Sequence, residues 1–500
     1  MKTPPLFSVF RILCLFATLP ARAVPIPAEP MEIGTGPQFF IDDYLIDNRW
    51  ALNYDNGSTQ MVTRVLHQPK KYEQNPVLVP AVGKAASATK PNAGWCNVLR
   101  DPTTGLFRIW YQQTIVSETE EWANYGVAYA ESKDGLKWTQ PKLGLITWNG
   151  DKDNNVVWRG LKGRRASSSF IVDVPEGDRR GYRYIMLYLD AGIQLVGSKD
   201  GIHWDRESVT TLTKMHSDTL NCIVYDASRK EYVMFCRAKH IYHVGGDKDV
   251  LEVGESRRVA RIASKELWTE WKSEPQNVLV ADEIDAESSY TAFYGMPAQI
   301  YGGIYWGFAE AFKWNTAKEP ELTFSRDGRD FQRLPVRNKF IPLGPEGSWD
   351  DGMVSSPTRW LEVGDEWWFY YSGWDGPHNV KEAPPRFGQI GLAKARKEGL
   401  ISMRGPTDGG IICTRQIRWP GGKLMVNVDA REGEFRVRVV DEKRKPIPGF
   451  GYDDFGTFKG NSVNQEIKWK GGSIESLKGR VIRLEFFLKD ADIFTFRATG

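Results

Sequence analysis

The segment Ser132-Lys133-Asp134-Gly135-Leu136-Lys137-Trp138 decides the fold, because its pattern returns along the chain. It recurs as Ser198-Lys199-Asp200-Gly201-Ile202-His203-Trp204 and, with changes, in segments that begin at Ser264, Ser325 and Ala393. Successive copies begin 66, 66, 61 and 68 residues apart. A segment that returns at a nearly constant period is typical of an architecture in which each copy belongs to one structural unit.

An aromatic stretch precedes each copy of this segment, and a shorter apolar stretch precedes most of these. The aromatic stretches are Phe107 to Tyr111, Tyr182 to Tyr188, Tyr232 to Cys236, Ile304 to Phe308 and Trp367 to Tyr371. With 19 Trp, 19 Tyr and 48 Gly, the composition favours strands joined by glycine turns. We predict an all-β fold of five four-stranded units, which form a five-bladed β-propeller. Its inner strands are expected near residues 96–100, 167–172, 219–225, 295–300 and 352–359.

The Asp-Gly pair within each copy has a structural explanation. A tight hairpin needs a residue with a positive φ, which glycine supplies. Because the pair recurs in several units, we expect Asp134, Asp200 and Asp327 to lie at the outer rim. The aromatic residue that follows is expected to pack between neighbouring units.

The repeat ends near Gly405, and this boundary divides the chain. We assign residues 31–405 to the propeller, with 31–90 as a segment that contributes a closing strand. Residues 406–500 contain alternating strands without the repeat, and we assign them to a β-sandwich.

Residues 1–23 have the pattern of a secretory signal peptide: Lys2 and Arg11, an apolar run from Ile12 to Leu19, and a small-residue site at Ala21-Arg22-Ala23. The pattern predicts a secreted or periplasmic protein. Removing these residues takes away three basic side chains, so the formal charge of +3 falls to zero. A balanced charge argues against nucleic acid as a partner, and the apolar run is too short for membrane insertion.

The remaining cysteines are Cys96, Cys222, Cys236 and Cys413. They form no Cys-x-x-Cys motif or Cys/His cluster, so no metal site is predicted. Cys222 and Cys236 flank one predicted hairpin, and both a disulfide and two adjacent buried thiols remain open there.

The chain resembles glycoside hydrolase family 32, and its propeller resembles family 43. More closely, it is similar to secreted bacterial proteins that are related to the N-terminal domain of family 32. The resemblance rests on Asp42-Asp43-Tyr44-Leu45-Ile46, the repeated turns, Asp218-Thr219-Leu220-Asn221, Gly347-Ser348-Trp349-Asp350-Asp351-Gly352 and the stretch from Leu424 to Ala430. It implies a propeller followed by a β-sandwich, and action on carbohydrate.

The sequence departs from family 32 in the first unit. Where that family has a Trp-x-Asn-Asp-Pro nucleophile motif, this chain has Gly94-Trp95-Cys96-Asn97, which contains no carboxylate. Arg100-Asp101-Pro102 is similar to the family's Arg-Asp-Pro motif. Asp101 nevertheless occupies the turn position that Asp226 has in the third unit, and we interpret it as a turn residue.

Residues that precede inner strands should gather at one mouth of the propeller, where a polar pocket would form. Cleavage of a glycosidic bond normally needs two carboxyl groups. We predict Asp218, Glu287 and Asp350 as catalytic residues, with Glu287 as the general acid and Asp218 as the base or nucleophile. Asp285, beside Glu287, is the alternative third member.

Six further residues are predicted to bind substrate at this mouth, through charges or through aromatic faces that stack on sugars. They are Asp43, Trp95, His216, Arg237, Trp349 and Asp351. The expected partner is an oligosaccharide or polysaccharide. No cofactor is required, and calcium in the channel remains open.

We therefore predict a secreted protein similar to glycoside hydrolases, that is, an enzyme acting on O-glycosyl bonds. Two alternatives remain open: a glycan-binding propeller without catalysis, and phosphorylase or lyase chemistry in the same pocket. Acids converging in the pocket would favour hydrolysis. A pocket dominated by Arg, Lys and His would favour phosphate or uronate chemistry.

Overall fold

The computed structural model describes residues 27–51, 61–81, 92–115, 124–148, 150–161, 165–215, 217–237, 257–334, 336–378 and 387–499. The fold is all-β, as predicted. Within these residues the helices are short: α2 (Glu283–Ser288), α3 (Tyr452–Phe455), and the 3₁₀ turns η1 (Glu176–Asp178) and η2 (Ile474–Leu477). None of the described helices has the length and apolar character that a membrane crossing requires.

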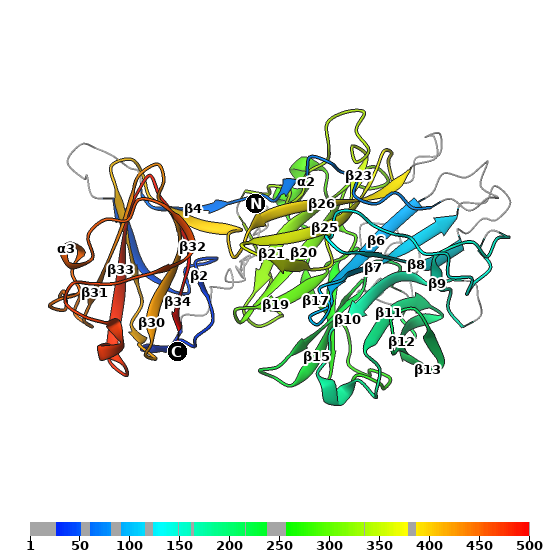
Figure 1. Ribbon diagram of the computed structural model, residues 1–500, viewed down its shortest axis with the longest axis horizontal. Helices are drawn as coiled ribbons and strands as arrows, with labels where there is room; N and C mark the ends of the chain where they lie inside the picture. The colour runs from blue at the N-terminus through cyan, green and yellow to red at the C-terminus, as the bar shows by residue number, and fades with distance from the viewer. Residues whose placement is uncertain are drawn as a thin grey trace, which may run out of the picture. The chain divides into compact units, whose positions relative to one another are not determined.

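The chain divides into two compact units (Figure 1). Unit 1 comprises Met1–Val65 and Ile401–Gly500, and unit 2 comprises Leu66–Leu400.

Unit 2 contains three separate antiparallel sheets, which we call groups 2, 3 and 4. Group 2 is β10 (Ser167–Val172), β11 (Tyr184–Asp190), β12 (Gly192–Ser198) and β13 (Trp204–Thr213). Group 3 is β14 (Cys222–Asp226), β15 (Glu231–Cys236), β16 (Val259–Ser264) and β17 (Gln276–Leu279). Group 4 is β18 (Ala292–Phe293), β19 (Ala298–Tyr301), β20 (Ile304–Phe312), β21 (Lys318–Ser325) and β22 (Gln332–Arg333).

A nine-stranded sheet contains the two remaining groups. Group 1 is β6 (Asn92–Arg100), β7 (Phe107–Ile115), β8 (Asn124–Ser132) and β9 (Val156–Trp158). Group 5 is β23 (Met353–Val354), β24 (Trp360–Val363), β25 (Glu366–Trp374), β26 (Gly388–Arg396) and β5 (Lys70–Lys71). The two groups meet through one parallel pairing, Gly388 with Asn92. The first strands of groups 1 to 3 begin within four residues of the predicted inner strands.

The repeated segment forms the predicted Asp-Gly turns. Asp134 Oδ1 accepts hydrogen bonds from the backbone N–H groups of Leu136 and Lys137, at 2.8 and 2.9 Å. Gly201 has a φ of +82°, and a Cβ at this position would lie 2.6 Å from the Trp110 ring. The Trp110 indole donates a hydrogen bond of 2.7 Å to the carbonyl of Gly201, so this turn ties group 2 to group 1. These contacts support the structural interpretation of the repeat.

Unit 1 contains two sheets. One has the order β1 (Met31–Glu32), β29 (Ile417–Arg418), β33 (Val481–Lys489), β28 (Gly410–Thr414) and β3 (Ile46–Ala51), with β31 (Glu434–Val440) also paired to β33. The other has the order β32 (Asn461–Glu466), β30 (Lys423–Asp429), β34 (Asp492–Thr499), β27 (Ile401–Arg404) and β4 (Thr63–Leu66), with β2 (Gln38–Phe39) paired to β34. Apolar side chains of both sheets share one core, in which the rings of Phe486 and Phe496 lie 5.6 Å apart.

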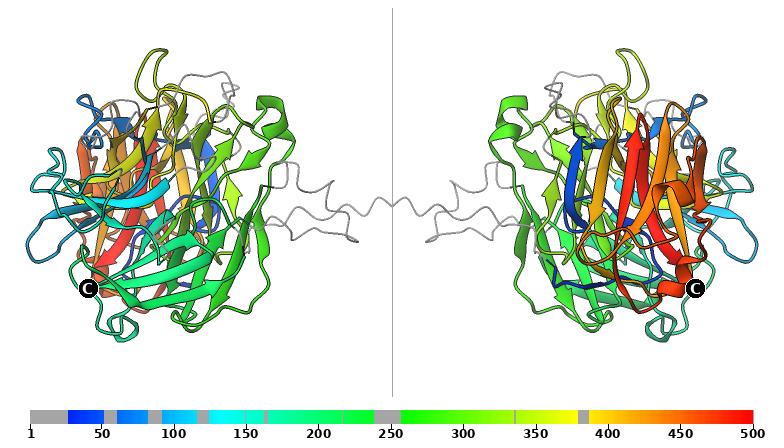
Figure 2. Two further views of the ribbon diagram at one scale, coloured as in Figure 1. Left: turned by 90° about the vertical axis from the view of Figure 1, so that its right-hand side faces the viewer. Right: turned by 90° about the vertical axis from the view of Figure 1, so that its left-hand side faces the viewer.

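The N-terminal strands differ from expectation. We expected residues 31–90 to contribute a closing strand to the propeller. β5 of this segment pairs with β26 of group 5, whereas β1 to β4 pair with strands of the C-terminal sheets (Figure 2). β1 runs parallel to β29, and β3 pairs antiparallel with β28. The reason is hydrophobic: Phe40, Leu45 and Ile46 are buried in the core of unit 1.

Candidate functional site

A cavity of about 130 Å³ gathers residues from all five groups of unit 2. Some of its lining residues lie near the beginning of the first strand of a group. The others lie next to these positions, most of them on neighbouring strands. The described lining residues are Asn92, Gly94, Trp95, Gln112, Thr114, Tyr125, Ser167, Asp218, Tyr294, Lys318, Met353, Trp374 and His378. The sequence predicted such a pocket from the placement of polar residues before the inner strands.

Asp218 supplies the one carboxylate among the described residues that line this cavity. It precedes β14, and its side chain is 44% exposed. Its Oδ1 lies 2.7 Å from Nη2 of Arg165, whose Nε also donates to Ser167 Oγ. The ion pair therefore holds the Asp218 carboxylate in one orientation while leaving it accessible to a ligand.

Three aromatic rings surround a buried lysine at the cavity. Lys318 Nζ lies 4.9 Å from the ring centroid of Trp95, 5.0 Å from that of Tyr294 and 4.9 Å from that of Trp374. The ammonium donates a hydrogen bond of 3.0 Å to Ser355 Oγ. Cation–π attraction of this kind fixes the lysine and the three rings relative to one another.

Glu310, on β20, is fully buried and contacts Trp95 and Lys318. Its Oε1 accepts hydrogen bonds from the Trp95 indole at 2.9 Å and from the Ser356 backbone N–H at 3.0 Å, and lies 3.6 Å from Lys318 Nζ. Its Oε2 is buried without a hydrogen-bond partner. Glu310 therefore positions Trp95 and Lys318 and does not line the cavity. Sequence reasoning missed it, although a single acid within the apolar run Ile304–Phe312 was a signal.

Two arginines lie beside the cavity. Arg237 directly follows β15 and is 1% exposed, and Arg257 precedes β16. Burial lowers the pKa of Arg237 to about 10, and the charge of Arg257 adds to this effect, whereas Tyr294 and Asp218 oppose it. The structure thus places the predicted Arg237 near Asp218 and adds Arg257, which the sequence analysis did not select.

Asp350 does not reach the cavity, which corrects the predicted catalytic set. It is buried, and its Oδ2 lies 2.6 Å from Lys71 Nζ and 3.0 Å from the Tyr371 hydroxyl. Trp349 stacks on Tyr371 with ring centroids 5.6 Å apart, and Asp351 Oδ2 accepts a hydrogen bond from the Gly347 N–H. Neither lines the cavity. The prediction failed because it did not anticipate that β5 brings Lys71 to this loop.

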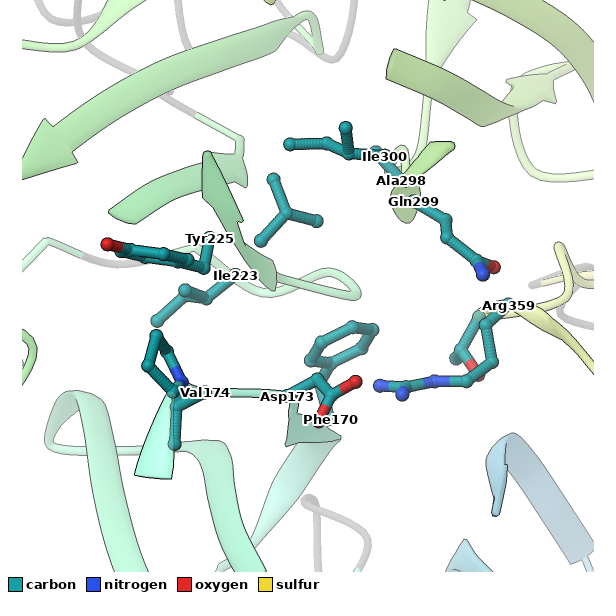
Figure 3. A pocket seen from close by; sticks show the side chains of 12 residues that line it. Phe170, Asp173, Val174, Ile223, Tyr225, Ala298, Gln299, Ile300 and Arg359 are labelled. Atoms are coloured by element: carbon teal, nitrogen blue, oxygen red, sulfur yellow. The ribbon is translucent and has the colours of Figure 1, made fainter. Parts of the chain in front are cut away.

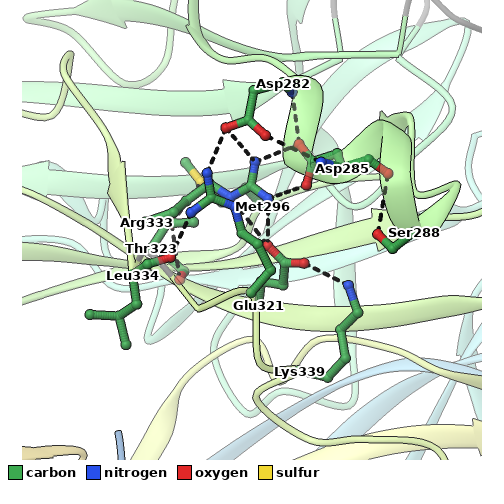
Figure 4. Close-up of polar contacts among 11 residues, drawn as sticks. Asp282, Asp285, Ser288, Met296, Glu321, Thr323, Arg333, Leu334 and Lys339 are labelled. Carbon is green, nitrogen blue, oxygen red and sulfur yellow. Dashed lines mark hydrogen bonds and ion pairs between the residues drawn. The ribbon is translucent and has the colours of Figure 1, made fainter. Parts of the chain in front are cut away.

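Glu287 and its neighbour Asp285 do not line the cavity either. Glu287 is an exposed residue of α2. Asp285 is buried and forms a bidentate ion pair with Arg333 (Figure 4). Because α2 places this acid against a guanidinium, Asp285 is a structural residue.

Two predicted residues lie elsewhere. Asp43 belongs to unit 1, where it pairs with Arg64 at 2.7 Å. His216 lies outside the described residues. Trp95, which we predicted to bind substrate, lines the cavity.

A second cavity, of about 340 Å³, is lined by residues near the other ends of first strands (Figure 3). Phe170, Ile223 and Ile300 line it together with Asp173, Gln299 and Arg359. The Arg359 guanidinium points toward Asp173 in Figure 3 and also donates to the carbonyl of Ile171. Opposite charges therefore face each other at this cavity, and its Asp173 is exposed.

Among the described residues, no cluster of His, Cys, Asp and Glu is suited to hold a metal ion. Cys222 and Cys236 are free thiols, and burial raises the pKa of each to about 12. Of a disulfide and two buried thiols, the two alternatives left open for this pair, the structure has buried thiols.

No family model matches this chain, and no curated protein matches it. Similar solved structures include an N-acetylgalactosamine deacetylase from F. plautii in complex with blood group B trisaccharide. Its TM-score is 0.44 at 17% identity, over 67% of this chain and 95% of that one. A glycosyl hydrolase from Bacteroides ovatus has a TM-score of 0.43 at 12% identity, over 67% and 97% of the two chains. A thermostable family-43 glycoside hydrolase has a TM-score of 0.40 at 13% identity, over 66% and 96%.

Proposed function

We propose that unit 2 is a five-bladed β-propeller whose axial cavity binds a glycan, with Asp218 as the carboxylate that acts on the glycosidic bond. In this proposal groups 1 to 5 are the blades, and the parallel pairing of Gly388 with Asn92 closes the ring between blades five and one. Unit 1 is a β-sandwich completed by the N-terminal strands.

The composition of the cavity is the observation that carries this function. Residues from all five groups converge on a half-exposed carboxylate and three aromatic rings. Aromatic faces bury the apolar faces of sugar rings, while polar side chains around them bond the hydroxyl groups. A carboxylate at such a wall can act as base or nucleophile toward the anomeric carbon.

The rings and Asp218 are held before substrate arrives. Glu310 bonds Trp95, and Lys318 contacts Trp95, Tyr294 and Trp374. Arg165 orients the Asp218 carboxylate. Fixing these groups in advance reduces the ordering that binding would otherwise require.

Glycan binding without cleavage is a second candidate function, and one observation favours it. Among the described residues that line the cavity, Asp218 is the single carboxylate, whereas glycoside hydrolysis normally uses two.

The deciding experiment compares Asp218→Asn with the unchanged protein in a glycan-library assay that measures both released sugar and binding. We expect turnover to fall by about 10²–10⁴-fold, because the amide cannot transfer a proton or attack carbon. Asp351→Asn is the matched control, since its side chain lies outside the cavity and its amide oxygen can still accept the Gly347 hydrogen bond. Full turnover in Asp218→Asn would refute the assignment. Binding without any turnover in the unchanged protein would establish the second candidate.

We also propose that the mature protein is secreted or periplasmic after cleavage near Ala23. Residues 1–23 lie outside the described residues, so this proposal rests on the sequence pattern alone. Amino-terminal sequencing of the exported protein tests it, and a start at Met1 would contradict it.

A further inference from the structure

Two guanidinium groups beside the cavity carry buried nitrogens for which the described part of the chain provides no hydrogen-bond partner. These are Nε and Nη1 of Arg237 and Nη1 of Arg257. Arg237 is 1% exposed, and its backbone N–H bonds Ser217, the residue before Asp218. The Arg257 guanidinium stacks on Tyr294, a lining residue, with its Cζ 4.7 Å from the ring centroid.

The charges around this end of the cavity do not balance. Among the residues that the structure describes here, Arg165, Arg237, Arg257 and Lys318 carry four positive charges, whereas Asp218 and Glu310 carry two negative charges. Asp218 is already paired with Arg165, and Glu310 lies nearest to Lys318. Arg237 and Arg257 are therefore the two cations for which these carboxylates provide no direct partner.

Leaving two guanidinium groups side by side without an anion is unfavourable, because buried charges need a partner and like charges repel. The lowered pKa of Arg237 expresses this, since burial and Arg257 both disfavour its charged form. Neither arginine is a lining residue of the cavity, and the unpaired nitrogens are buried. An oxyanion in the cavity would relieve the repulsion and would accept hydrogen bonds from these nitrogens once a rotamer change brings them to the cavity wall. Arginine is suited to this task because its planar fork matches the oxygens of carboxylate and phosphate.

We propose that the cavity binds an oxyanion against Arg237 and Arg257, beside Asp218. This inference rests on the proposed function and names its substrate class. The oxyanion is either the carboxylate of a uronic acid unit within the glycan or an inorganic phosphate bound together with a neutral glycan.

The test measures binding to the full mature protein by isothermal calorimetry at low salt. The probes are matched pairs of sugars, galacturonate with galactose and glucuronate with glucose, and inorganic phosphate with and without a neutral disaccharide. We expect a uronate to bind at least tenfold more tightly than its neutral partner, or phosphate to bind and to strengthen disaccharide binding. The first result identifies a uronate and the second identifies phosphate.

The variants Arg237→Met and Arg257→Gln should each weaken binding of the oxyanion by about tenfold or more, because each loses charge-assisted hydrogen bonds. Arg329→Gln, at an exposed turn residue, is the matched control and should change affinity by less than about twofold. Asp247, Asp249, Glu252 and Glu255 lie outside the described residues, and a variant with all four replaced by Asn or Gln provides a second test. A gain in oxyanion affinity in that variant would mean that acids of the chain already match the two arginines, which overturns the proposal.

The two proposals fail in different ways. If neutral glycans bind or are cleaved as well in Arg237→Met as in the unchanged protein, and oxyanions give no advantage, the oxyanion site is refuted and the glycan site stands. If no glycan binds and Asp218→Asn changes nothing, the proposed function itself is refuted.

Discussion

Two arginine clusters in unit 2 carry buried charge in different ways. Around Arg333, three cations face three carboxylates: Arg333, Arg337 and Lys339 against Asp282, Asp285 and Glu321. Figure 4 shows Arg333 and Lys339 bonded to carboxylates of this cluster. Around Asp218, the described residues comprise four cations and two carboxylates, and within this part of the chain Arg237 and Arg257 retain unpaired nitrogens.

The pKa directions of the two arginines follow this difference. Burial acts to lower the pKa of Arg333, but its hydrogen bonds with Asp285 and the charges of Glu321 and Asp282 outweigh burial and raise it. For Arg237, burial and Arg257 lower the pKa to about 10. Buried charges that are paired with opposite charges of the same chain indicate a structural cluster. Buried charges without such partners are typical of a ligand-binding site.

Arg333→Met should be the most damaging of the changes to these clusters. It leaves the buried carboxylates of Asp285 and Glu321 with fewer partners, and breaking a buried pair by removing one member costs about 3–5 kcal/mol. Urea denaturation should show this loss as a lower midpoint. A midpoint equal to that of the unchanged protein would show that the cluster contributes no stability.

Arg237→Met should have a smaller effect of the opposite sign. Removing a buried charge without a direct partner relieves desolvation and the repulsion from Arg257, so the free energy of unfolding should stay equal or rise by up to about 2 kcal/mol. Urea denaturation in a buffer without phosphate or carboxylate measures this change in the free energy of unfolding. A loss as large as that of Arg333→Met would contradict the distinction between the two clusters.

The strands of unit 2 could be predicted because their signals are local. The repeat, the aromatic stretches and the Asp-Gly pairs each lie within one group, and Gly201 requires its positive φ within a single turn. The pairing of the N-terminal strands could not be predicted in this way. Met31 pairs with Ile417, and nothing in a local pattern specifies a partner so distant along the chain.

The candidate site was predicted in part for the same reason. Asp218 and Trp95 lie near the beginning of the first strands of their groups. From this position alone the sequence predicted that both lie at the cavity, where the structure has them. Asp350 has a similar position, but Lys71 on β5 and Tyr371 on β25 engage its carboxylate. Glu310 lies on β20 and Lys318 on β21 of group 4, not on a first strand. Their contribution depends on packing between groups, which a local sequence pattern does not specify.

Asp101→Asn tests whether an acid of group 1 belongs to the chemistry of the cavity, and it should have the smallest effect. Asp101 Oδ1 accepts hydrogen bonds from the N–H groups of Thr103 and Thr104, at 2.9 and 3.1 Å, and Oδ2 lies 2.6 Å from Arg183. It is buried in a turn and is not a lining residue. We expect turnover to be unchanged and stability at neutral pH to fall by about 1 kcal/mol, because the amide accepts these bonds more weakly than the carboxylate.

The stability of the unchanged protein and of Asp101→Asn should also differ in how it changes with pH. The Thr104 hydrogen bond, with help from Thr103 and Arg183, lowers the pKa of Asp101 below its ordinary value of 3.8. A carboxyl with a lowered pKa in the folded state contributes stability above the unfolded pKa and loses it as the pH falls through the folded value. The unchanged protein should therefore lose more stability than Asp101→Asn between about pH 5 and pH 2, measured as the melting temperature of each. Loss of turnover by tenfold or more at neutral pH, with the melting temperature unchanged, would instead give Asp101 the role that its similarity to the Arg-Asp-Pro motif implies.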